Sequence, residues 1–212
     1  RQRVDPFCAR ARLAEPAPRL HRDLAGTVRV VFFDGGYAGL QPVEGGRLNL
    51  CLLADGPLYR DLGSWPALLA HLLREPGLAA LADGEALLAK PLAISRVPYG
   101  HLARPGGDGL WRLGDQAAVI PSFCGDGMGI ALESGRLAAR MLAAGASADE
   151  YQAALLARTR RPVRRAMGAL RLAETRLGRL AALAGLAAIP GALALLARMT
   201  RVADPNSLAP AG

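Results

Sequence analysis

The 212-residue chain has little lysine and few aromatic residues, and these shortages exclude one class of function. Lys90 is the only lysine, so arginine supplies nearly all of the positive charge behind a formal net charge of +8. Aromatic residues make up 5% of the sequence and do not alternate with the basic ones, as a surface that stacks on nucleic-acid bases would require. The charge therefore predicts a solvated basic surface, and we expect no nucleic-acid partner.

Cysteine is scarce as well. The three cysteines are an odd number at wide, unrelated spacings: Cys8, Cys51 and Cys124. Such spacing is not typical of a disulfide scaffold, so we expect a reducing, cytoplasmic environment. His21 and His101 have no cysteine or acidic residue at metal-ligand spacing, and His71 lies between leucines in a helical pattern, so we expect no metal site.

The most informative stretch is residues 110–140, LWRLGDQAAVIPSFCGDGMGIALESGRLAAR. We expect residues 110–113 to form a short apolar strand that ends at Gly114 and Asp115. Ligands of open α/β sheets bind at the carboxyl ends of strands. The sequence therefore predicts that the Asp115 carboxylate meets a ligand.

A glycine-rich loop and a helix follow this turn. Pro121 stiffens the loop, while Gly125 and Gly127 allow the backbone to approach a ligand closely. We expect a helix to begin between Asp126 and Gly129. Its start would aim free N–H groups and the positive end of the helix dipole at the loop. The segment predicts a binding site for an electron-rich ligand.

These spaced residues resemble the second FAD-binding motif of flavoproteins of the glutathione-reductase superfamily. They are most similar to the group that includes flavin-dependent monooxygenases and geranylgeranyl-reductase-like oxidoreductases. The resemblance implies that Asp115 accepts hydrogen bonds from the ribityl chain and that the loop lies along the flavin ring. The FAD-binding residues that it implies are Gly114, Asp115, Pro121, Gly125, Asp126, Gly127 and Met128. The sequence departs from the family at Gln116 and Ala117, where Ala-His is common, so any role of that histidine is absent.

Three β-rich runs occupy residues 27–33, 37–43 and 47–53, with a glycine turn between each pair. This pattern predicts an antiparallel meander. The segment that begins at Gly36 also resembles the sheet that covers the flavin in geranylgeranyl-reductase-like proteins. The residues best able to orient a substrate there are Tyr37, Gln41 and Asn49.

The last third of the sequence is helical in pattern. Residues 149–179 are rich in arginine, and residues 180–197 carry no charge but are broken by Gly185 and Pro190. The uncharged run is too short and too interrupted for a transmembrane helix, so we expect two short packed helices. As an alternative, residues 151–201 could rest on an anionic membrane surface, at the inner face of the membrane.

The expected fold class is α+β, as a fragment of an FAD/NAD(P)-binding α/β flavoprotein. We expect an irregular or truncated edge at 1–22, a substrate-side antiparallel sheet with helices at 23–103, an FAD-binding strand–loop–helix at 104–145, and a helical region at 146–212. The family's first motif, a dinucleotide-binding Gly-x-Gly-x-x-Gly, is missing near Arg1. This suggests the C-terminal portion of a longer protein, or a chain with a separate N-terminal partner.

The resemblance implies an FAD-dependent oxidoreductase that hydroxylates or reduces a small hydrophobic substrate, with NAD(P)H as electron source. Such a fragment is expected to be inactive alone. The sequence does not choose between hydroxylation and double-bond reduction, and no residue is a convincing general acid or base. The alternative is a non-catalytic, basic, amphipathic module that binds a membrane surface or a partner protein, in which the glycines are only structural.

Overall fold

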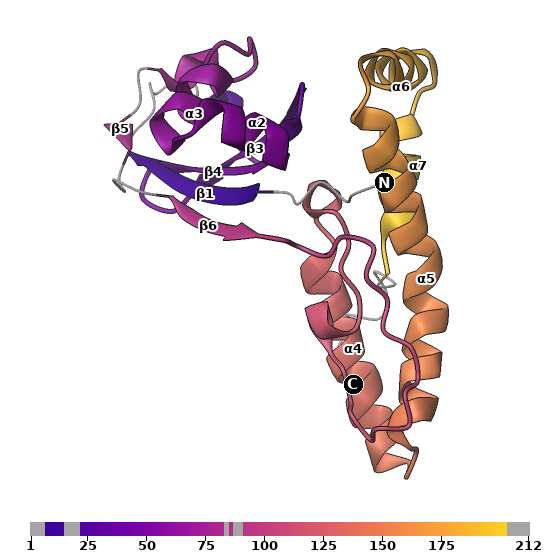
Figure 1. Cartoon of the computed structure of the whole chain (residues 1–212). Helices are drawn as coiled ribbons and strands as arrows, with labels where there is room; N and C mark the ends of the chain where they lie inside the picture. Colours follow the sequence, from indigo (N-terminus) through magenta and orange to yellow (C-terminus); the bar gives the residue numbers. More distant parts are fainter. Residues whose placement is uncertain (1–6, 15–21, 83–84, 87–90, 203–212) are drawn as a thin grey trace. The chain divides into compact units, whose positions relative to one another are not determined.

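The computed structural model describes residues 7–14, 22–82, 85–86 and 91–202, and it divides into two compact units, Arg1–Val97 and Pro98–Gly212 (Figure 1). This division falls a few residues before the boundary we expected after residue 103. It also places the expected 104–145 and 146–212 segments in a single unit. Each unit has its own buried residues and is described separately.

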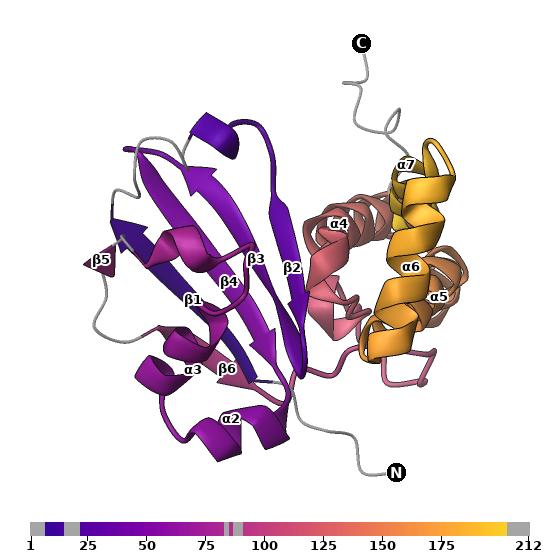
Figure 2. The same cartoon turned by 90° about the horizontal axis from the view of Figure 1, so that it is seen from above.

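The first unit is built on a six-stranded sheet in which every pair of neighbours is antiparallel. The strand order is β2-β3-β4-β1-β5, and β6 also pairs with β1 (Figure 2). The strands are β1 (Phe7–Ala14), β2 (Arg29–Phe33), β3 (Gly36–Val43), β4 (Arg47–Ala54), β5 (Glu85–Ala86) and β6 (Leu92–Ser95). The meander predicted over residues 27–53 is confirmed, because β2, β3 and β4 are antiparallel neighbours in chain order.

Strand β1 corrects one of our expectations. We expected an irregular or truncated edge at residues 1–22, but Phe7–Ala14 is a regular strand that pairs with β4, from Phe7 opposite Ala54 to Leu13 opposite Leu48. Residues 1–6 and 15–21 lie outside the described residues. The weak local pattern misled us because β4 satisfies the backbone hydrogen bonds of β1 from far along the chain.

Helices α2 (Gly56–Leu62) and α3 (Trp65–Leu72) cover one face of this sheet (Figure 1). Each has a side-chain cap: Leu58 N–H donates to Asp55 Oδ1 at 2.8 Å, and Ala67 N–H donates to Ser64 Oγ at 3.3 Å. The short 3₁₀ helix η1 (Ala79–Leu81) follows them. Alternate leucines of β4 point at these helices: Leu48, Leu50 and Leu52. They form one core with Leu68 and Leu72 of α3.

The second unit is mainly helical, as we expected for the end of the chain. Its elements are η2 (Gly114–Gln116), η3 (Ser122–Cys124), α4 (Gly127–Ala143), α5 (Ala148–Ala173), α6 (Arg176–Ala188) and α7 (Ala192–Thr200). Ser147 and Glu150 form a capping box at the start of α5. Of the two interruptions we expected, the one at Pro190 separates α6 from α7, whereas α6 continues through Gly185. Among the described helices, none is both long enough and apolar enough to cross a membrane.

The strand expected over residues 110–113 does not form. Leu113 has extended backbone, with φ −119° and ψ 160°, but no neighbouring strand pairs with this segment among the described residues. An apolar run becomes a strand only when another strand takes up its backbone hydrogen bonds. Here the segment packs on a helix: the ring of Trp111 stacks on Tyr151 with centroids 4.8 Å apart.

Candidate functional site

The turn at Gly114 and Asp115 lies directly against helix α4. Gly114 N–H donates to Ser134 Oγ at 2.9 Å, and that hydroxyl donates to the carbonyl of Ala131 at 2.8 Å. Gly114 has φ +51°, and a Cβ added there would lie 3.5 Å from the Cβ of Ala131. The glycine therefore serves both a left-handed turn and a close approach to the helix. Asp115 follows Gly114 in η2, which packs on α4, and its side chain is exposed.

The loop before α4 is a tight turn. Pro121 is buried, and its carbonyl accepts the N–H of Cys124 at 3.1 Å. Gly125 ends η3 with φ +70°, and its N–H donates to the carbonyl of Ser122 at 3.0 Å. The chain then enters α4 at Gly127, so the predicted start of the helix between Asp126 and Gly129 is confirmed.

The first turn of α4 has unused backbone donors. Within the described part of the chain, the N–H groups of Gly127, Met128 and Gly129 have no acceptor, and the Asp126 side chain makes no capping hydrogen bond. A Cβ added at Gly127 would meet nothing within 4 Å, so the packing of the chain does not itself require glycine there. The side chain of Met128 is 78% exposed. Free donors, the helix dipole and open space together suit an electron-rich ligand.

The Asp126 side chain accepts a hydrogen bond from a distant residue and does not cap its own helix, α4. Its Oδ2 accepts the N–H of Val202, beyond the end of α7, at 2.6 Å. Burial raises the pKa of the Asp126 carboxyl, although the Val202 N–H and the Arg201 guanidinium act in the opposite direction. One carboxylate oxygen of Asp126, a predicted FAD-binding residue, therefore already accepts a backbone hydrogen bond.

Cys124, in the same loop, is not an activated nucleophile. Burial raises the pKa of its thiol to about 11, and the nearby Asp126 charge adds to that rise. A hydrogen bond with Thr200 lowers the pKa, but by less. The thiol is therefore protonated at neutral pH, whereas nucleophilic attack and metal binding need the thiolate. The described residues also hold no group of three or more His, Cys, Asp or Glu side chains that could bind a metal ion.

Tyr151 of α5 holds the segment before Gly114 in place, and sequence reasoning had no signal for it. Its ring is fully buried, and its hydroxyl lies 2.9 Å from the carbonyl of Arg112 and 3.3 Å from that of Ser134. The hydroxyl thus joins α5, α4 and the segment that leads into η2. A tyrosine in a long basic helix has no local pattern that would mark it as such a bridge.

The substrate-side candidates lie together on the sheet of the first unit. Gln41 and Asn49 are directly opposite each other on β3 and β4, and Tyr37 is on the same face of β3. This face is opposite to the one covered by α2 and α3, since the residues between them in sequence face those helices. Tyr37 and Asn49 are buried and Gln41 is exposed, and Asn49 Nδ2 donates to Cys51 Sγ at 3.1 Å. Their contact with a substrate stays a prediction.

No family model and no curated protein matches the chain, but solved structures match its fold. The flavin-dependent brominase Bmp2 aligns with 93% of this chain and 50% of its own, at 13% identity and a TM-score of 0.67. PqsL, a probable FAD-dependent monooxygenase from Pseudomonas aeruginosa, aligns over 84% of this chain and 51% of its own, at 23% identity and a TM-score of 0.56. CndH, a myxobacterial chondrochloren halogenase described as FAD-dependent, aligns with 95% of this chain and 50% of its own, at 16% identity and a TM-score of 0.55.

The chain thus spans about half the length of each of these structures. Similarity at such low identity establishes a shared fold. The chain therefore has the α+β fold of one part of an FAD-binding flavoprotein, as we expected from the sequence. Fold alone does not establish a reaction, which must be argued from the site.

Proposed function

We propose that this chain is the flavin-ring side of an FAD-dependent oxidoreductase. The observation that carries the proposal is the start of α4, where unused N–H groups at Gly127 and Met128 adjoin open space. Asp115 is exposed and directly follows Gly114, whose N–H donates to Ser134 of the same helix. The shared fold with FAD-dependent enzymes supports this assignment.

The residues present fit the flavin. The N–H groups of Gly127 and Met128 would donate to the electron-rich edge of the ring, and Asp115 would accept from a ribityl hydroxyl. Pro121 and Gly125 would shape the loop along the ring. The bound flavin would supply the electron chemistry, which this chain's side chains do not.

We propose further that the substrate is small and hydrophobic, that NAD(P)H is the electron source, and that the face of the sheet with Tyr37, Gln41 and Asn49 orients the substrate. Both hydroxylation and double-bond reduction, the latter as in geranylgeranyl-reductase-like proteins, fit these residues. The names of the structural neighbours add halogenation to the reactions that this fold carries. Oxygen consumption with NAD(P)H separates an oxygen-dependent reaction from reduction of a double bond.

The test uses the complete gene product together with its dinucleotide-binding segment, whether that segment belongs to the same chain or to a partner. We expect flavin absorbance in the purified protein. Asp115→Ala should weaken FAD binding about ten- to a hundredfold, because a charge-assisted hydrogen bond contributes roughly 1.5–3 kcal/mol. The control is Asp23→Ala, which removes an exposed carboxylate from the first unit. An unchanged FAD dissociation constant in Asp115→Ala would make Asp115 a turn residue only.

A second candidate function is contact with an anionic membrane surface through residues 151–201. It is favoured by exposed apolar side chains on α6 and α7 near arginines: Leu177 is 81% exposed, Leu180 57% and Leu195 58%. Apolar groups flanked by cations suit a lipid headgroup layer. Sedimentation with phosphatidylserine vesicles, combined with the absence of flavin absorbance, would favour this function over the first.

A further inference from the structure

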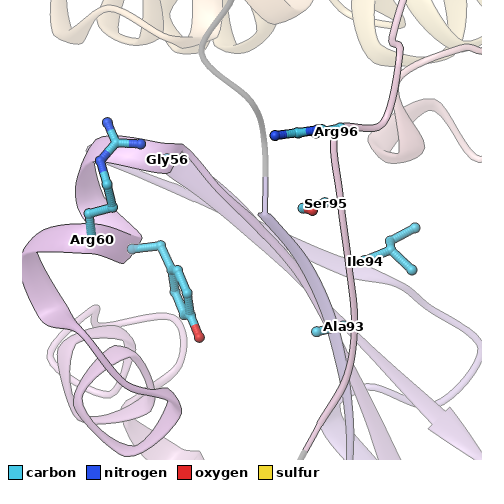
Figure 3. A pocket seen from close by; sticks show the side chains of 7 residues that line it. Gly56, Arg60, Ala93, Ile94, Ser95 and Arg96 are labelled. Atoms are coloured by element: carbon cyan, nitrogen blue, oxygen red, sulfur yellow. The ribbon is translucent and has the colours of Figure 1, made fainter.

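Exposed apolar side chains are found on both units of the chain. In the sheet unit they include Leu92 and Ile94 of the edge strand β6, which also lines a pocket of about 400 Å³ together with helix α2 (Figure 3). In the helical unit they include a row on helix α4. The row on α4 is the less usual feature, because the solvent side of a helix in a globular domain is normally polar.

Helix α4 is apolar on two sides. One side packs within the unit through the buried residues Ile130, Leu137 and Ala138. The helical period places a second set of uncharged residues together on another side, where all but the half-buried glycine are exposed: Ala131, Leu132, Gly135, Ala139 and Leu142. The exposed arginines Arg136 and Arg140 lie between the two sides. A helix that is apolar on both sides is typical of one covered by protein on both sides.

Residues 110–113 extend this apolar row. A Cβ added at Gly135 would lie 3.9 Å from Cδ2 of Leu113, so the row and the segment are in contact. Trp111 is partly buried against the same helix, while the side chains of Leu110 and Leu113 are 57% and 39% exposed. The row on α4 therefore forms one continuous apolar surface with these two leucines, which we call the α4 surface.

The backbone of residues 110–113 also has unused hydrogen-bond donors. Within the described part of the chain, the N–H groups of Trp111, Arg112 and Leu113 have no acceptor. Leu113 already has the extended backbone of a strand, with φ −119° and ψ 160°. An added strand would accept these donors, as in binding by strand addition. A helix would not, because its own backbone carbonyls are already paired.

We propose that the α4 surface docks the dinucleotide-binding segment named above, and that residues 110–113 become a strand by pairing with a strand of that segment. The solved structures that share this fold are about twice as long as the part that aligns, so the remainder of such a fold is large enough to cover this surface. The identity of the docked segment rests on the proposed function. The surface itself is defined without reference to flavin.

Hydrogen–deuterium exchange of the complete gene product, together with its dinucleotide-binding segment, tests the docking. We expect the amides of Trp111, Arg112 and Leu113 to exchange at least about a hundredfold more slowly than unpaired amides, because a paired strand protects its N–H groups. Exchange of these three amides at the rate of unpaired amides would overturn the proposal.

Ala139→Glu tests the surface directly. It places a charge in the middle of the α4 surface, where docking would bury that charge without a partner, and we expect it to abolish the protection of residues 111–113. Arg136→Glu is the matched control, because it introduces the same side chain at an exposed position of the same helix outside the α4 surface. It should leave the protection unchanged. Slow exchange within α5 in both variants shows that the helical unit is still folded. Equal protection in the two variants would count against the proposal.

Flavin absorbance of the same samples separates this inference from the proposed function. Protected amides at residues 111–113 without flavin would support the docking and contradict the proposed function. Bound flavin with unprotected amides would overturn the docking and leave the proposed function intact. Sedimentation of the same samples identifies the docked partner. A dimer of identical copies that Ala139→Glu dissociates would assign the α4 surface to a second copy and overturn the proposal.

Discussion

Different kinds of internal contact stabilise the two units of this chain. The sheet unit has one continuous apolar core, in which Leu40, Leu48 and Leu50 are completely buried beneath α2 and α3. The helical unit has two smaller apolar clusters, and polar groups are buried between its elements. Apolar contacts are non-directional, whereas hydrogen bonds fix distance and angle. The first unit is therefore suited to be a stable scaffold, and the second to hold a loop in one position.

Polar side chains of the helical unit connect α4 and α5 to each other and to the turn at Gly114. The Ser134 hydroxyl accepts the Gly114 N–H, and the Tyr151 hydroxyl lies within hydrogen-bond distance of the carbonyls of Arg112 and Ser134. Glu133 of α4 forms an ion pair with Arg158 of α5. A partly satisfied polar network is costly, so these groups tolerate few alternative positions. We infer that stability in the first unit depends on apolar volume, and in the second on individual hydrogen bonds.

The largest effect should come from the apolar core of the sheet unit. Leu50→Ala should lower the free energy of unfolding by about 2–5 kcal/mol, because it leaves a cavity among closely packed leucines. Urea denaturation of the complete gene product measures the change. Leu92→Ala removes the same group at a site that is 69% exposed, and its effect should stay within about 0.5 kcal/mol. Equal losses in both variants would contradict a single dominant core.

An intermediate effect should come from one hydroxyl of the helical unit. Tyr151→Phe keeps the ring stacked on Trp111 but removes the bonds to Arg112 and Ser134, and should cost about 1–3 kcal/mol. The control is Thr159→Val, because the Thr159 hydroxyl donates within its own helix, to the carbonyl of Leu155 at 2.9 Å, and bonds to no other segment among the described residues. The same denaturation experiment compares them. A loss in Thr159→Val as large as that in Tyr151→Phe would show that the bridge between elements has no special weight.

The smallest effect should be a change in how the free energy of unfolding depends on pH. Burial raises the folded pKa of Asp126 above its ordinary value of 3.8, so the folded protein binds the proton more tightly than the unfolded chain. The stability contributed by this group is therefore fully present below pH 3.8 and is lost as pH rises through the folded pKa. Asp126→Asn keeps an acceptor for Val202 and should remove that loss.

The measurement is the difference in unfolding free energy between Asp126→Asn and the unmodified protein across this pH range. Subtraction is needed because the pKa of another carboxyl is shifted the opposite way, which gives an opposite pH dependence of stability. The hydrogen bond from Arg112 lowers the pKa of Asp108 to about 2. We expect the variant to gain relative stability as pH rises above 3.8. A difference that is constant with pH would show that the Asp126 carboxyl is not perturbed in the folded protein.

Patterns confined to a few neighbouring residues were predictable. The glycine turns between β2, β3 and β4 and the start of α4 at Gly127 depend on backbone conformations that residue types encode directly. The break between α6 and α7 follows from Pro190, which cannot continue a helix.

The sequence by itself thus determined the glycine turns of the meander, the start of α4 and the break between α6 and α7, but not the break between α5 and α6. Only the tertiary structure decided that Phe7–Ala14 is a strand, that residues 110–113 are not, that Tyr151 bridges three segments, and that Asp126 bonds to Val202. Each of these depends on a partner distant in the chain. Local residue patterns specify which backbone conformations are favourable, but hydrogen bonds between distant segments exist only once the fold has brought their donors and acceptors together.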